Sequence, residues 1–138
     1  MQKEFSDEQK ERMAFGLKLE PVILASYEER TGNPVEPDQP LYFHPDHNWM
    51  AATPDALAKT PDGQIGIECK ASSSRMLDHY GESVDKFGED GTDQVPAIYL
   101  LQAQWQMAVI GLQRVDLPIL FDSSALRVYT VLRDDSII

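Results

Sequence analysis

The sequence predicts an α/β fold, layered as α+β, in which a central mixed β-sheet is flanked by helices. Two segments, residues 6–31 and 96–112, carry apolar residues at helical spacing. Between and after them lie short runs with the alternation of β-strands, and Asp62-Gly63 is typical of a hairpin turn. The order helix, hairpins, helix, two strands therefore indicates one sheet packed between two helices.

The composition limits the class of protein. A chain of 138 residues with 42% hydrophobic and 25% charged residues is expected to form a single domain with its own core. We expect a cytoplasmic protein without membrane contact, because no apolar run could span a bilayer and the first residues lack a signal-peptide core. One cysteine excludes an internal disulfide and a four-cysteine metal site.

The net charge of −11 argues against a protein that binds nucleic acid through basic residues alone. It is compatible with a nuclease whose carboxylates bind cations, since those cations supply positive charge where the phosphate lies.

The first expected helix covers residues 6–31. Ser6 and Gln9 have the spacing of a capping box, and Gly32 follows the last turn. Pro21 is expected to kink the helix or to begin a second helical segment. Glu20 precedes this proline among apolar neighbours, so it is either a solvated side chain or one that points into a site.

Residues 35–52 are predicted to be largely irregular, with short strands at 41–43 and 49–52. His44 and His47 form an H-x-x-H pair. We interpret this pair as part of a polar loop, because no third zinc ligand of the usual kind is near. Trp49 and Met50 are predicted to be core residues.

The hairpin over residues 53–70 carries the most distinctive chemistry. If the chain reverses at Asp62-Gly63, paired residues have numbers that sum to about 125, which places Asp55 near Lys70 and one diagonal step from Glu68. Strand alternation puts Glu68 and Lys70 on one face of the strand and Cys69 on the other. Two carboxylates so close stay ionised only with a cation between them, and oxygen ligands favour Mg²⁺ or Mn²⁺. The alternative is an ordinary surface hairpin with a salt bridge.

The segment after the hairpin is polar. Ser72, Ser73 and Arg75 either hold phosphate oxygens or form an ordinary polar loop. Residues 76–94 are acidic and rich in glycine, which predicts a surface loop.

The second helix has two stripes. Leu101 and Trp105 belong to an apolar stripe, and Tyr99, Gln102 and Gln106 form a polar stripe beside it. The sequence leaves open whether these amides face solvent or are buried with hydrogen-bond partners. Two strands are predicted to follow the helix, at residues 116–121 and 126–132.

Five motifs follow one another along the chain. They are Gly16-x-x-x-Glu20-Pro21, Trp49-Met-Ala-Ala-Thr-Pro-Asp55, Ile67-Glu68-Cys69-Lys70, Pro96-x-x-Tyr99-x-x-Gln102-x-Gln104-x-Gln106 and Tyr129-Thr-Val-Leu-Arg133-Asp134. Together they resemble the lambda-exonuclease / YqaJ branch of the PD-(D/E)xK nucleases, over about residues 13–135.

The resemblance implies a restriction-endonuclease-like core and a Mg²⁺-dependent or Mn²⁺-dependent DNA nuclease of a phage or its bacterial host. The expected activity is an exonuclease that resects linear duplex ends 5′ to 3′ for recombination, with a single-strand annealing protein as partner and a homotrimer as assembly. The alternatives are an endonuclease with the same site and a non-catalytic module that docks an annealing protein. We do not expect residues 1–138 to include the N-terminal extension and C-terminal helix of longer relatives.

The resemblance also assigns roles to residues. Asp55, Glu68 and the backbone carbonyl of Cys69 would hold the metal ion, and Glu20 would bind it directly or through water. The other expected roles are Lys70 as the group that positions and activates the attacking water, Gln102 as the group that orients that water or Lys70, and Ser72, Ser73, Arg75 and Tyr99 as DNA contacts.

Overall fold

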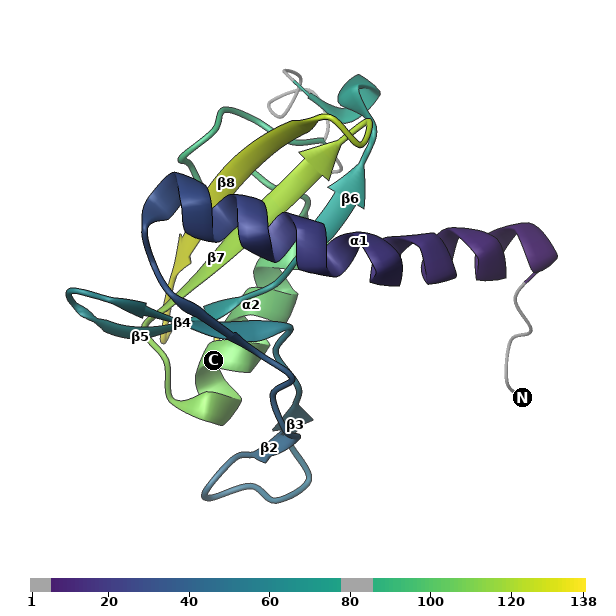
Figure 1. Ribbon diagram of the computed structural model, residues 1–138. Coiled ribbons are helices and arrows are strands. Elements are labelled where there is room, and N and C mark those ends of the chain that lie inside the picture. Colours follow the sequence, from purple (N-terminus) through teal and green to yellow (C-terminus); the bar gives the residue numbers. More distant parts are fainter. Residues whose placement is uncertain (1–5, 78–85) are drawn as a thin grey trace.

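The computed structural model describes residues 6–77 and 86–138, so residues 78–85 of the predicted surface loop lie outside the described part. Two α-helices and eight strands form within it (Figure 1). The helices are α1 (Asp7–Thr31) and α2 (Ala97–Ile110), and a short 3₁₀ helix covers Ser74–Met76. The strands are β1 (Val35–Pro37), β2 (Tyr42–Phe43), β3 (Ala51–Ala52), β4 (Ala56–Thr60), β5 (Gly63–Ile67), β6 (Lys70–Ser72), β7 (Arg114–Phe121) and β8 (Ala125–Leu132).

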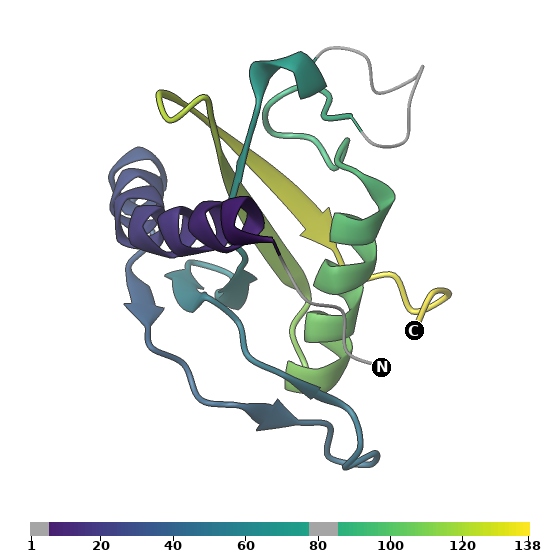
Figure 2. The same ribbon diagram turned by 90° about the vertical axis from the view of Figure 1, so that its right-hand side faces the viewer.

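The main sheet has the order β1-β4-β5-β7-β6, and β8 also pairs with β7. The sheet is mixed, because β5 and β6 run parallel to β7 whereas the other pairs are antiparallel. Figure 2 shows α1 on one side of the sheet and α2 on the other. The predicted fold, a mixed sheet between two helices, is confirmed.

The first helix begins and ends as predicted. Ser6 and Gln9 form the capping box, and Gly32 ends the helix in the left-handed conformation with a φ of 75°. The helix continues through Pro21, so the expectation of a second helical segment is wrong. Leu24 and Tyr27 lie in the core just after the proline, and their burial stabilises the helix despite the lost backbone hydrogen bond.

Two apolar clusters hold the sheet between its helices. The larger joins α2 to the sheet through buried residues such as Met107, Leu117 and Tyr129. The smaller joins α1 to the other side of the sheet through Leu24, Tyr27 and Ile67. No helix in the described ranges is long and apolar enough to cross a membrane.

A buried carboxylate fixes α1 to the centre of the sheet. Asp116 of β7 has no exposed surface, and its carboxylate accepts hydrogen bonds from the Tyr27 hydroxyl (2.7 Å), the Thr130 hydroxyl (2.9 Å) and the Arg114 guanidinium (2.8 Å). Because a buried charge needs a partner of opposite sign and several donors, this network compensates the cost of burying it.

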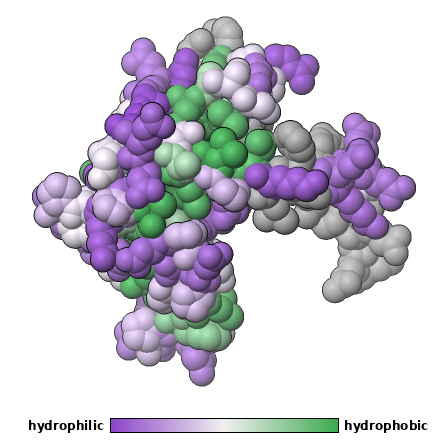
Figure 3. All heavy atoms as spheres, in the orientation of Figure 1, coloured by the Kyte–Doolittle hydropathy of each residue, from purple (hydrophilic) through white to green (hydrophobic). Residues whose placement is uncertain are grey.

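The β2–β3 pair forms a small arm that projects from the main sheet (Figure 1). Apolar residues gather on this arm in Figure 3. Trp49 lies on it with 72% of its surface exposed, so its predicted place in the core is wrong. The neighbouring Met50 is half-buried. The apolar side chains of the β2–β3 arm therefore contribute to the protein surface and not to the core.

Candidate active site

The candidate site lies where the chain passes from β5 to β6. Both strands run along β7 in one register, with Ile67 opposite Asp116 and Lys70 opposite Ile119. The two residues between the strands, Glu68 and Cys69, leave the regular ladder, although the Glu68 N–H still donates to the Asp116 carbonyl at 3.1 Å. This short irregularity is where the acidic side chains meet.

The hairpin has a register two lower than predicted. Thr60 pairs with Gly63, so Pro61 and Asp62 occupy the centre of the turn, and Ala56 pairs with Ile67. Continuing this register by one residue places Asp55 opposite Glu68 and not opposite Lys70. The proline, whose ring fixes φ, moves the turn one residue toward the N-terminus.

Each of the two carboxylates has one oxygen occupied by a protein donor. The Cys69 N–H donates to Oδ2 of Asp55 at 2.8 Å, and the Gln106 amide donates to Oε2 of Glu68. Lys70 Nζ lies 3.7 Å from the other Glu68 oxygen, Oε1. The two occupied oxygens fix the orientation of both groups, while Oδ1 of Asp55 and the Lys70-paired Oε1 of Glu68 lie outside these two hydrogen bonds.

The two carboxyl groups influence each other strongly. Burial, followed by the Asp55 charge, raises the pKa of Glu68 to about 7, and Lys70 acts in the opposite direction. Burial also raises the pKa of Asp55, against the stabilising effects of the Cys69 N–H and Lys70. Glu68 in its protonated form donates a hydrogen bond to Asp55. A site that keeps both groups ionised at neutral pH therefore needs additional positive charge.

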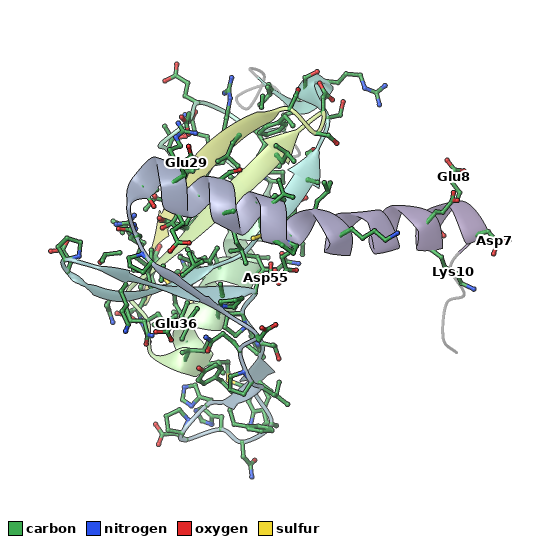
Figure 4. All side chains as sticks on the ribbon, viewed as in Figure 1. Asp7, Glu8, Lys10, Glu29, Glu36 and Asp55 are labelled. Carbon is green, nitrogen blue, oxygen red and sulfur yellow. The ribbon has the colours of Figure 1, made fainter. Side chains whose placement is uncertain are left out.

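The donor set of Asp55 and Glu68 fits a hard divalent cation. The Asp55 and Glu68 carboxyl groups are neighbours, each is oriented by a hydrogen bond from the protein, and hard cations prefer oxygen ligands. Figure 4 shows Asp55 below the middle of α1, and it lies just before the first residue of β4. Among residues 6–77 and 86–138, no three side chains of the ligand type form a compact cluster, so two carboxylates are the side-chain part of this set.

Glu20 comes close to this place from α1 but faces another hollow. Burial raises its pKa first, and the charges of Asp55 and Asp38 raise it further, which indicates that the Glu20 and Asp55 carboxylates are neighbours. Glu20 lines a hollow of about 410 Å³ together with Asp38, and Glu68 lines a different one. The structure therefore brings Glu20 near the pair without adding it to the ligand cluster.

Lys70 lies between an acid and an aromatic ring. Its Nζ is 3.7 Å from Glu68 and 5.0 Å from the centre of the Tyr99 ring, a distance at which a cation and an aromatic face attract. Burial raises the pKa of Tyr99, so its hydroxyl stays protonated at neutral pH. The prediction that Glu68 and Lys70 share a face is confirmed by their contact. Cys69 packs against the cluster under α1, on the other face.

The amide that contacts the acidic pair is Gln106, whereas sequence reasoning assigned this kind of role to Gln102. Gln106 is 6% exposed, and its Oε1 is a buried oxygen without a hydrogen-bond partner in the described residues. Gly66 permits this packing, because a Cβ there would lie 3.3 Å from Gln106 Oε1. Gln102 is exposed and lines the same cavity of about 380 Å³ as Glu68 and Gln106.

The expected DNA contacts after Lys70 lie at the far end of β6. Ser72 pairs with Phe121 at the end of β7, and the Ser74 N–H donates to Asp122 in the β7–β8 turn. The Ser73 hydroxyl accepts from the Arg75 N–H at 3.3 Å, and Arg75 is exposed. The structure therefore places Ser72, Ser73 and Arg75 along one line from Lys70 but does not gather them around Glu68.

Comparison with known proteins identifies the family. The family model of the YqaJ-like viral recombinase domain matches residues 1–113. The chain belongs to the YqaJ-like viral recombinase family. The Bacillus subtilis protein YqaJ is 29% identical over 107 residues, which are 77% of this chain and 30% of that protein.

Solved structures agree with this family. The crystal structure of an alkaline exonuclease from Laribacter hongkongensis, LHK-Exo, superimposes with a TM-score of 0.68 at 27% identity, over 91% of this chain and 60% of that one. The structure of LHK-Exo in complex with dAMP gives a TM-score of 0.66, also at 27% identity, over 98% and 63%. The chain thus spans about three fifths of the exonuclease and under a third of YqaJ.

Two features of this YqaJ-like site escaped the sequence analysis. The helical spacing puts Gln102 and Gln106 on one face but does not say which turn of α2 lies beside the acids. Asp116, which holds Tyr27 by its carboxylate and Glu68 by its carbonyl, was treated as an ordinary strand residue. An acidic residue within the apolar run after Arg114 was the available signal.

Proposed function

We propose that this YqaJ-like chain is a metal-dependent DNA nuclease, and that it is an exonuclease degrading linear duplex ends 5′ to 3′ in recombination. The observation that carries the proposal is the Asp55–Glu68 pair with Lys70 Nζ 3.7 Å from Glu68. Its structural relative LHK-Exo is an alkaline exonuclease and has been crystallised with dAMP, a single DNA nucleotide. The family supports the recombination context.

The residues that would hold the metal are Asp55 and Glu68, through the oxygens outside the hydrogen bonds from the Cys69 N–H and the Gln106 amide, and the Cys69 carbonyl. We assign Glu20 a contact through water, because it neighbours Asp55 from a separate hollow. Mg²⁺ is the proposed ion, with Mn²⁺ as substitute, and when bound it polarises the phosphate and lowers the pKa of the attacking water.

The protein side chains position the reacting groups. Lys70, held between Glu68 and the Tyr99 ring, directs its ammonium toward the phosphate and the attacking water, where it stabilises the charge that develops. Gln102 is exposed in the same cavity, and its amide orients the water or a phosphate oxygen. Tyr99, Ser72, Ser73 and Arg75 contact the DNA on either side of this point.

The partners follow from the same proposal. The substrate is the end of a linear duplex, the product strand is passed to a single-strand annealing protein, and the active assembly is a homotrimer that encloses DNA. With a net charge of −11, a single chain attracts DNA poorly, so the metal ions supply positive charge at the phosphate.

The first test is digestion of a linear, 5′-phosphorylated duplex by the wild type and by Lys70→Ala, each with Mg²⁺ and with EDTA. Lys59→Ala is the matched control, since Lys59 is an exposed strand lysine paired with Glu36. We expect digestion only by the wild type and the control, and only with Mg²⁺. If the wild type leaves linear, single-stranded and circular DNA intact with both Mg²⁺ and Mn²⁺, the proposed activity is wrong, and the chain is an incomplete nuclease domain or a binding module.

Two further substrates test the finer proposal. A supercoiled circle has no ends, so nicking of it would show an endonuclease with the same site. Duplexes blocked by phosphorothioate linkages at either the 5′ or the 3′ ends report polarity. Blocking the 5′ ends is expected to stop the reaction, and blocking the 3′ ends is expected to leave it unchanged.

A further inference from the structure

Four rings follow one another along the β2–β3 arm and onto α2. The centres of the His44 and His47 rings are 4.9 Å apart, those of His47 and Trp49 are 5.9 Å apart, and those of Trp49 and Trp105 are 6.5 Å apart. All three pairs are tilted, with interplanar angles of 41–54°. We call these four residues the ring row.

The ring row is both exposed and fixed. Trp49 is 72% exposed and Trp105 is 42% exposed, although large aromatic side chains contribute most to stability when they are buried. The Trp105 indole N–H donates to the Ala51 carbonyl at 2.9 Å, which joins helix α2 to the arm. His44 Nδ1 accepts from the Asp46 N–H at 3.0 Å. A ring held in place yet open to solvent, as Trp105 is, loses little entropy when a flat ligand stacks on it.

The row leads directly to the acidic pair. Trp105 lines the same cavity as Glu68, together with Ile98, Leu101 and Gln102. Ile98 and Leu101 are themselves more than half exposed, so the wall between the row and the carboxylate is apolar. A strand whose phosphate lies at Glu68 would continue across this wall toward Trp105 and Trp49.

We infer that the ring row is a stacking site for the unpaired nucleotides of a single DNA strand. The identity of the ligand rests on the proposed nuclease function, because the row is continuous with the cavity of Glu68. Bases of a single strand expose their faces to aromatic rings, whereas the bases of a duplex are covered by their neighbours. Stacking also suits a chain of net charge −11, since it needs no attraction between phosphates and basic residues.

The chain offers a built-in reporter for this site. It contains two tryptophans, Trp49 and Trp105, and both belong to the ring row. Intrinsic tryptophan fluorescence is titrated with an oligothymidylate of about 12 nucleotides, in EDTA so that the strand stays intact. We expect saturable quenching by the single strand and much weaker quenching by the same strand annealed to its complement. Absence of quenching, or equal quenching by the duplex, would overturn the inference.

Variants locate the effect. Fluorescence anisotropy of a labelled oligothymidylate is expected to show binding weakened about tenfold by Trp49→Ala, in line with the loss of one stacked base. Trp49→Phe keeps a ring and is expected to bind within about twofold of the wild type. Leu132→Ala removes an equally exposed apolar side chain outside the row and is the matched control. If Trp49→Ala binds DNA normally but changes the sedimentation coefficient, the row is a protein interface and the inference is wrong.

Failure of this inference is distinct from failure of the proposed function. Digestion of linear DNA with Mg²⁺ is measured on the same preparations. Digestion without tryptophan quenching would overturn the stacking site and leave the nuclease intact. Saturable quenching without digestion in Mg²⁺ or Mn²⁺ would overturn the nuclease proposal while the single-strand site stands.

Discussion

Replacing Glu68 by glutamine tests the acidic pair without destroying its shape. Glutamine has the same size as glutamate, and its side-chain oxygen still accepts the hydrogen bond from Gln106. The change removes one of two neighbouring buried charges, whose repulsion is opposed in the metal-free protein mainly by Lys70. We therefore expect a metal-free protein that is more stable at alkaline pH and inactive as a nuclease.

The magnitude follows from the pKa of Glu68. Burial and Asp55 raise this pKa from 4.5 to about 7, so folding favours the protonated carboxyl. The wild type therefore has its full stability below pH 4.5 and loses stability as the pH rises toward 7. At pH 8 the loss is roughly 3 kcal/mol. The raised pKa already includes the favourable effect of Lys70. We therefore expect glutamine to gain up to about 3 kcal/mol at pH 8, or about 10 °C in Tm.

The assay is thermal unfolding followed by circular dichroism, in EDTA, at pH 5 and pH 8. Glu68→Gln should unfold several degrees above the wild type at pH 8 and at about the same temperature at pH 5, where Glu68 is protonated. Adding Mg²⁺ should raise the Tm of the wild type at pH 8 and not that of the variant. A variant less stable than the wild type at pH 8, or a difference independent of pH, would refute the reasoning.

Three other substitutions test residues that hold the site or the sheet beneath it in place. Gln106→Leu should lower the digestion rate about tenfold at an almost unchanged Tm, because it frees Glu68 from its donor and removes an unpaired buried oxygen. Tyr99→Leu should reduce activity by releasing Lys70, whereas Tyr99→Phe keeps the ring and the rate. Asp116→Asn should lower the free energy of unfolding by about 3 kcal/mol in urea titration, because it leaves the Arg114 charge unpaired.

Each of these has a result that contradicts it. A Gln106→Leu protein with normal activity would show that Glu68 is oriented without the amide. Equal rates for Tyr99→Leu and Tyr99→Phe would exclude the contact between ring and ammonium as a support of Lys70. An Asp116→Asn protein as stable as the wild type would show that the buried network is compensated elsewhere.

The local signals in the sequence identified the elements well. A capping box at Ser6, glycines at 32 and 111, and a turn near Asp62 act over a few residues, so they need no tertiary information. Glu68 and Lys70 were placed on one face by strand alternation, and their side chains do meet, although Glu68 lies in the irregular step before β6. The fold class followed because these elements alternate in an order that one sheet between two helices satisfies.

Local signals in the sequence could not show which side chains are buried and which are exposed to solvent. The choice between Gln102 and Gln106 depends on which turn of α2 packs against the sheet, and Gln106 is the one that lies close to Gly66. The register of the hairpin depends on whether Pro61 or Gly63 occupies the centre of the turn, which the Asp-Gly pair alone does not decide. Trp49 was placed in the core because large aromatic side chains are usually buried, whereas on the β2–β3 arm this side chain is exposed to solvent.

The exposed tryptophans Trp49 and Trp105 and the acidic pair Asp55 and Glu68 have one property in common, which is the short range of the forces they exert. A chain with 23 acidic and 12 basic residues repels a polyanion at long range, so the forces that hold a strand must act at short range. In the proposed function, the carboxylates Asp55 and Glu68 would act at contact distance through a cation, and in the proposed stacking site Trp49 and Trp105 would act at contact distance through their ring faces. Neither force reads sequence, because every nucleotide has a phosphate and a flat base. The arrangement therefore suits an enzyme that moves along a strand without pausing at particular bases.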